Sequence, residues 1–285
     1  MSAVRVLRKA VRWSFAVTLP GEAVLVVCLL SGARVTPVVR VVVESLVCAV
    51  VVAAMTLFAL DYRRHHRDRP DRRAALRAAV ADTVPALARR LLSHELALFT
   101  SVLRRFSGRG PHGVGEGDAA VPYAAAQRDV MYGLGFVSVV EAVALAWLVP
   151  DPVVHAVTLV VDVWAVYFVF ALQLSCVVRP HVVGADGSLR LRYGVLVDVR
   201  IPARYVASVR VDRRFSGGRM GAVDADGVTR LGVGGQTTVT VELTRPVGFV
   251  RPLGRPAEAR VFHWYAEDPA AAVAAWRARA VLDDR

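Results

Sequence analysis

Four long apolar runs constrain the fold of this 285-residue chain more than any other feature of its sequence. They lie at residues 13–33, 37–60, 130–149 and 152–178. A bilayer core about 30 Å thick needs about 20 apolar helical residues to cross it, so we predict four transmembrane helices. Pro20, Gly21 and Glu22 interrupt the first run, and a cleaved signal peptide is the main alternative for it.

The placement of arginine predicts how these helices are oriented, because basic residues near the ends of spans are retained in the cytoplasm. The N-terminal tail, the segment DYRRHHRDRPDRR at residues 61–73 and the region that begins at Arg179 are basic. By contrast, Arg34 is the only basic residue between the first two runs, and the connection around Asp151 has none. We therefore predict a multi-pass protein of the inner (plasma) membrane with both termini in the cytoplasm.

The segment PALARRLLSHELALFTSVLRRF, at residues 85–106, has helical periodicity. Its apolar side carries Leu87, Leu91, Leu98, Val102 and Phe106, and its polar side carries Arg89, Arg90, Ser93, Thr100, Arg104 and Arg105. One hypothesis is that the four arginines are membrane-surface residues on the anionic inner leaflet. The other is that the apolar side packs on the cytoplasmic domain. The next segment, SGRGPHGVGEGDAAVP, is typical of a flexible loop.

From Arg179 onward, short segments with a period of two replace the long apolar runs. HVVGADGSLRLRYG predicts a β-hairpin that turns at ADG, with apolar residues alternating with Arg190 and Arg192. Further strands are predicted at VLVDVRI, VASVRVD, VTRLGV, TTVTVEL and VFHWYA. Asp268 can cap a final helix that begins at Pro269. These segments predict a β meander closed by one helix.

The order of the segments LRLRYG, VRIPARYVASV and EDPAAAVAAWRAR resembles the bacterial pleckstrin-homology-like (PH-like) domains that are attached to membrane spans. The resemblance covers about residues 181–282. The matching positions are Arg192, Gly194, Ile201, Pro202, Val206 and Val209. It extends to uncharacterised multi-span membrane proteins of actinobacterial type, and it implies an interaction or assembly module. No phosphoinositide-binding motif is carried over.

The predicted fold class is therefore an α+β membrane protein. It combines a four-helix transmembrane bundle with a cytoplasmic antiparallel β meander closed by a C-terminal helix. The predicted parts are residues 1–60 (the N-terminal tail and the first two spans), 61–129 (cytoplasmic amphipathic helices and the Gly-rich loop), 130–178 (the third and fourth spans) and 179–285 (the PH-like domain).

No pattern in the sequence indicates an enzyme, a cofactor or a metal site. The motif GRGPHG follows a predicted helix and lacks the strand–turn–helix context that a dinucleotide site requires. Cys28, Cys48 and Cys176 lie in separate apolar runs, which argues against a disulfide framework or a zinc site. We expect the lipid bilayer as a partner, together with a protein partner or self-association through the C-terminal domain. No nucleic acid is expected.

Polar residues within the apolar runs are the candidate functional residues, because burying a charge at mid-bilayer costs about 2.5 to 3.5 kcal/mol on insertion scales. They are Glu44, Glu141, His155, Asp162 and Gln173. At about 1.5 Å per helical residue, Glu141 and Asp162 reach similar depths. His155, Asp162 and Gln173 share one helix face, and Arg40 lies one turn from Glu44.

Two hypotheses explain this intramembrane polar cluster. In the first, the carboxyls form hydrogen bonds that hold the helices together, and the protein anchors a cytoplasmic interaction module. In the alternative, Glu44, Glu141 and Asp162 line a proton or cation path of a small transporter or ion-conducting protein, with His155 near its outer end.

Overall fold

The computed structural model describes residues 36–68, 71–84, 86–215 and 217–280. The first predicted span, at residues 13–33, lies outside the described residues. The chain divides into two compact units. One contains the described residues up to Leu92 together with Val139–Trp164, and the other contains Ser93–Ser138 and the chain from Ala165 onward.

Three helices are long and apolar enough to cross a membrane. They are α2 (Pro37–Asp68), α5 (Ala125–Leu148) and α6 (Pro152–Val178), and they confirm that the second, third and fourth apolar runs are helical. Asp151 caps α6, because its Oδ1 accepts a hydrogen bond from the Val154 backbone N–H (2.9 Å) and Pro152 occupies the first helical position. Apolar side chains such as Trp147 are exposed on these helices, as a lipid-facing surface requires.

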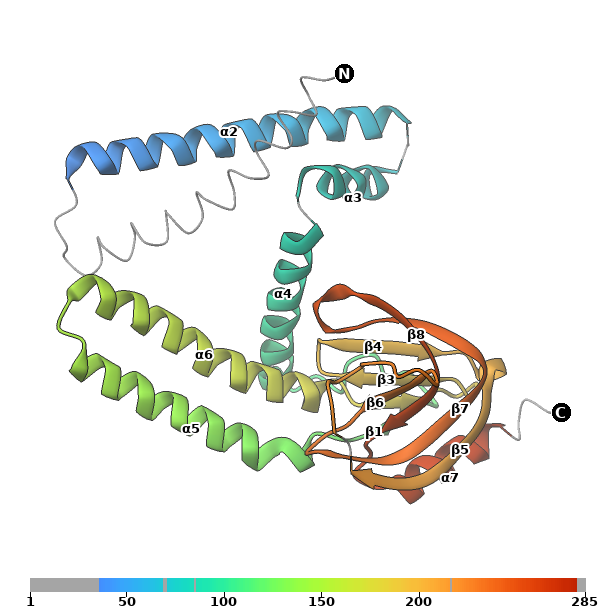
Figure 1. The fold of residues 1–285 in the computed structure, drawn as a ribbon. Helices are drawn as coiled ribbons and strands as arrows, with labels where there is room; N and C mark the ends of the chain where they lie inside the picture. The colour runs from blue at the N-terminus through green and yellow to red at the C-terminus, as the bar shows by residue number, and fades with distance from the viewer. Residues whose placement is uncertain (1–35, 69–70, 85, 216, 281–285) are drawn as a thin grey trace. The chain divides into compact units, whose positions relative to one another are not determined.

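The first unit also contains the short helix α3 (Arg72–Thr83), which packs beside α2 (Figure 1). Asp71 caps its N-terminus by accepting a hydrogen bond from the Arg73 N–H at 2.9 Å. The small side chains of Ala75 and Ala79 on α3 are fully buried and allow α2 and α3 to approach each other closely. His65 of α2 and Asp82 of α3 are joined at 2.9 Å. The basic segment after the second apolar run therefore continues α2 and then turns back as a second helix.

The second unit is built around two four-stranded sheets (Figure 1). The first sheet has the order β1 (Ala119–Val121), β2 (His181–Val183), β3 (Leu189–Tyr193) and β4 (Val197–Ile201). The second has the order β5 (Val206–Phe215), β7 (Gln236–Val250), β8 (Pro256–Trp264) and β6 (Val228–Leu231). The 3-10 helix η1 (Ala203–Tyr205) connects β4 to β5, η2 (Pro252–Gly254) connects β7 to β8, and helix α7 (Pro269–Ala280) follows β8.

Alternating burial creates a single apolar core in this β domain. In β4, for example, Val197, Val199 and Ile201 are buried while the two residues between them are exposed. Phe262 and Trp264 of β8 join the same core, and α7 contributes Ala272 and Val273. The hairpin predicted around ADG is confirmed, because β2 and β3 pair antiparallel with Val183 opposite Leu189.

Two features of the β domain differ from the predicted meander. Strand β1 lies in the segment predicted to be a loop. It pairs with β2, and Asp118 fixes the preceding turn by accepting hydrogen bonds from the Gly115 and Ala185 backbone N–H groups. In the second sheet, β6 is parallel to β8. Both edges of β7 are already occupied by β5 and β8, and β6 joins the sheet at the outer edge of β8.

Candidate functional site

Four residues of the predicted intramembrane polar cluster belong to the first unit and are distributed over three helices. Glu44 lies on α2, Glu141 on α5, and His155 and Asp162 on α6. Within the described part of the chain, the Asp162 Oδ2 atom is buried without a hydrogen-bond partner. Glu141 is exposed. The proximity of the two carboxyls stays a prediction.

Gln173, the fifth residue of that cluster, has a different environment from the one predicted. It belongs to the second unit and is buried there. Its Nε2 donates to the Ala124 carbonyl (3.2 Å), and its Oε1 accepts from Gln127 Nε2 (2.9 Å). Both the oxygen and the nitrogen of the amide therefore help to join the start of α5 to the end of α6.

These contacts are part of a buried network that we call the polar junction. It consists of Tyr123, Gln127, Gln173, Tyr193 and Gly194. The Tyr193 hydroxyl donates to Gln127 Oε1 at 2.6 Å, and the Gly194 backbone N–H donates to the Tyr123 hydroxyl at 2.7 Å. Burial raises the pKa of both tyrosines, so both hydroxyls stay protonated. The polar junction fixes the ends of α5 and α6 to the turn that follows β3.

His181 lies beside the polar junction and has a structural role. Its Nδ1 accepts from the Arg192 backbone N–H (2.9 Å), and its Nε2 donates to the Tyr265 carbonyl (3.1 Å), which defines the tautomer. Its ring lies 4.3 Å from that of Tyr123. Burial lowers the pKa of His181 to about 3, and the nearby Arg192 contributes to this shift. The neutral ring is thus a fixed core group that is unavailable for proton transfer at neutral pH.

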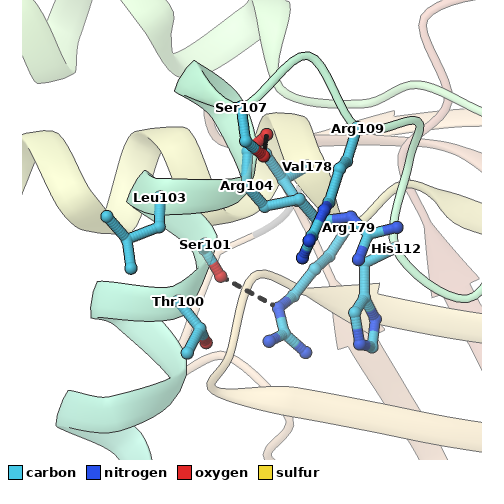
Figure 2. A pocket seen from close by; sticks show the side chains of 9 residues that line it. All are labelled: Thr100, Ser101, Leu103, Arg104, Ser107, Arg109, His112, Val178 and Arg179. Carbon is cyan, nitrogen blue, oxygen red and sulfur yellow. Dashed lines mark hydrogen bonds between the residues drawn. The ribbon is translucent and has the colours of Figure 1, made fainter.

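A second arrangement in the same unit is a cavity of about 350 Å³, which we call the basic pocket. It is lined by Thr100, Ser101, Leu103, Arg104, Ser107, Arg109, His112, Val178 and Arg179. Figure 2 shows the three arginine side chains, from α4 (Ala86–Phe106), the loop after it and the residue after α6, converging beside the histidine. Arg104 Nε donates to the Gly110 carbonyl at 2.8 Å, and Arg179 Nε donates to Ser101 Oγ at 3.2 Å.

The four predicted membrane-surface arginines do not share one environment. Arg104 lines the basic pocket. Arg89 caps the C-terminal end of α3, since its NH1 donates to the Ala81 and Val84 carbonyls. Arg90 and Arg105 are exposed on α4.

The apolar side of α4 supports the packing hypothesis in part. Leu98 is buried, and with Val102 it packs against Ala171 and Leu172 of α6. A second apolar stripe is exposed on the part of α4 that belongs to the second unit, and of its members only Phe106 belongs to the apolar side predicted from the sequence. It consists of Leu96, Phe99, Leu103 and Phe106. The hypothesis that α4 lies on the inner leaflet stays a prediction. Under that hypothesis, this exposed stripe is the apolar surface that contacts the lipid.

Neither the polar junction nor the basic pocket has the composition of a metal site. Among the described residues, no cluster of three or more His, Cys, Asp or Glu residues could hold a metal. The polar junction can fix a geometry, and the basic pocket can attract an anion. No protein-family model, curated protein or solved structure matches this chain.

Proposed function

We propose that this chain is an integral membrane protein whose apolar helices anchor a cytoplasmic β domain of PH-like type, and that this domain serves as an interaction or assembly module. The observation that carries the proposal is the polar junction. An anchor joined by a flexible linker would leave its domain free to rotate. Here the ends of two apolar helices are hydrogen-bonded into the domain core through Gln127 and Gln173.

Apolar contacts reinforce this attachment within the second unit. The rings of Tyr132 on α5 and Phe170 on α6 lie 6.1 Å apart. Leu172 packs with Val195 and Leu196, which lie between β3 and β4. Close-packed interiors transmit displacement with little compression. This construction suits a module whose core is tied directly to the ends of its anchoring helices.

The β domain offers a surface through which such a module can assemble. Strand β5 is an edge strand of the second sheet and pairs on one side only, with β7, so its other side has no strand partner in this sheet and can pair with another chain. It exposes Val211 and Phe215, and 97% of the Phe215 surface is accessible. Ion pairs between Arg210 and Glu242 and between Arg214 and Asp212 neutralise charge near this edge.

The transport alternative has one supporting observation, which is the buried Asp162 Oδ2 atom without a partner among the described residues. A proton or cation path through the membrane requires further polar groups beside Asp162. Gln173, which was predicted to share a face of α6 with His155 and Asp162, is engaged in the polar junction instead. We therefore favour the anchor.

The orientation of the proposed anchor predicts where reporters fused to the chain become active. Fusions after Gly110 and after Arg285 should report the cytoplasm, and insertions near Thr36 or Asp151 should report the outside, because the arginines lie on the cytoplasmic side of the apolar runs. Paired alkaline phosphatase and fluorescent protein fusions measure this. An external C-terminus would contradict the proposal.

The assembly role is tested with a photo-crosslinking amino acid placed on β5 in cells. At Phe215 or Val211 it should yield one discrete adduct, either with a second copy of the chain or with one partner, because both side chains flank the open strand edge. Asp226, exposed in the turn before β6, is the matched control position and should yield no adduct. Identical adducts at all three positions, or none at any of them, would exclude the β5 edge as the assembly surface.

A further inference from the structure

The basic pocket lies at the end of an apolar helix. Val178, the last residue of α6, lines it, and Arg179 follows directly. The second half of α4 and the loop that follows it, with Ser107, Arg109 and His112, complete its walls. If α6 spans the membrane as proposed above, the pocket opens where that helix leaves the bilayer.

Its positive charges are concentrated and uncompensated. No acidic residue is among the nine that line it. Within the described ranges, Arg104, Arg109 and Arg179 form no ion pair with a carboxylate. Asp198 acts on Arg179 at longer range, but its carboxylate is bound to Arg190 (2.8 Å). Like charges that converge without a counterion destabilise a fold, so this arrangement calls for an anion.

The donors that remain are suited to a phosphate group. Arg104 and Arg179 each donate one Nε–H to the protein, and no described residue accepts from their terminal nitrogens. Guanidinium groups bind phosphate oxygens through two parallel hydrogen bonds. The cavity of about 350 Å³ is within the usual size range of small-molecule sites.

His112 provides an independent observation. Its backbone is fixed on both sides, because its N–H donates to the Val178 carbonyl (2.8 Å) and its own carbonyl accepts from Arg192 NH1 (2.6 Å). Its Nδ1 is buried without a hydrogen-bond partner in the described part of the protein. Burial and then the surrounding arginines, Arg179 first, lower the pKa of His112. The His112 ring is therefore a neutral polar group in the pocket wall, and its Nδ1 forms no hydrogen bond with any described residue.

We propose that the basic pocket binds a phosphate group, which Arg104, Arg109 and Arg179 hold through charge-assisted hydrogen bonds. Leu103 lines the pocket and is also part of the exposed apolar stripe of α4. A lipid can thus place its phosphate in the pocket and its acyl chains along Leu96, Phe99 and Phe106. This route rests on the proposed membrane anchoring, whereas binding of free phosphate does not.

The test uses the full chain purified in a neutral detergent and two probes, inorganic phosphate and short-chain phosphatidylglycerol. The midpoint of thermal unfolding is measured at increasing concentrations of each probe, with phosphatidylcholine as the lipid without net charge. Arg109→Gln is the main variant, because Arg109 is exposed and its side chain forms no hydrogen bond or ion pair with any of the described residues. Arg105→Gln is the matched control, since it removes the same charge from a neighbouring exposed position outside the pocket.

The wild-type chain should be stabilised in a saturable way, and Arg109→Gln should weaken the apparent affinity about tenfold, as expected for the loss of a hydrogen bond between charged groups. Arg105→Gln should change it less than about twofold. A response to phosphatidylglycerol alone identifies a lipid phosphate, and an equal response to inorganic phosphate that competes with the lipid identifies a free anion. Equal losses in both variants, or no response to either probe, would overturn the proposal. A chain recovered in the soluble fraction would instead refute the anchor and leave the phosphate result standing.

Discussion

Replacing Tyr123 by alanine is expected to lower the free energy of unfolding of the β domain by about 3 to 5 kcal/mol, the range for removing a large buried aromatic side chain. Tyr123 is 0% exposed. Its ring contacts those of His181 and Tyr193, with centroids 4.3 Å and 6.3 Å away. The truncation opens a cavity at the centre of the polar junction and removes the acceptor for the Gly194 N–H.

The control for this variant is Tyr123→Phe, which keeps the ring and deletes only the hydroxyl. We expect a smaller loss of about 1 to 3 kcal/mol, because the buried Gly194 N–H is left without an acceptor. Urea unfolding of the full chain in detergent, followed by the near-ultraviolet circular dichroism of the aromatic core, measures both. If the alanine variant lost no more stability than the phenylalanine variant, the ring would not be a structural part of the domain.

Gly194→Ala is expected to cost about 2 to 5 kcal/mol, combining the left-handed backbone with overpacking. Gly194 has φ +49°, and a Cβ added there would lie 2.3 Å from Ser175 Oγ and 3.1 Å from Cys176 Sγ. The end of α6 and the turn after β3 would have to separate to admit the methyl group. The same urea unfolding assay reports the effect.

Two further variants separate the causes of that loss. Gly235→Ala places alanine at φ +74° with nothing within 4 Å of the new Cβ, so it should cost only the backbone contribution of about 1 to 2 kcal/mol. Adding Ser175→Ala to Gly194→Ala removes the atom that lies nearest and should recover part of the stability. Equal losses at Gly194 and Gly235 would show that the contact with α6 is not tight.

Local sequence patterns predicted the elements whose causes are local. The apolar runs at 37–60, 130–149 and 152–178 became α2, α5 and α6 because their length and composition allow little else. The final helix began where expected, since Asp268 Oδ1 accepts from the Ala271 N–H at 2.9 Å. The alternation in VLVDVRI placed Asp198 and Arg200 outward.

The parts that escaped prediction depend on residues distant in sequence. Gln127 bonds Gln173 across 46 positions and Tyr193 across 66, and no periodicity in the sequence records such a pairing. Arg192 was expected to point outward from its strand, yet it is only 1% exposed. The Gly-rich segment covers it and provides two acceptors, the carbonyls of His112 and Gly113. That coverage also forms one wall of the basic pocket.

The pairing of β1 with β2 has a consequence for the order in which the protein is made. Val121 lies opposite His181 in this pair, yet the whole of α5 and α6 separates them in the chain. The helical pair is therefore an insertion between two adjacent strands of one sheet. The ribosome must complete both helices before the first sheet can close, so the domain becomes folded only after α5 and α6 have been synthesised. After the sheet has closed, a change in the distance between the start of α5 and the end of α6 strains the pairing of β1 with β2.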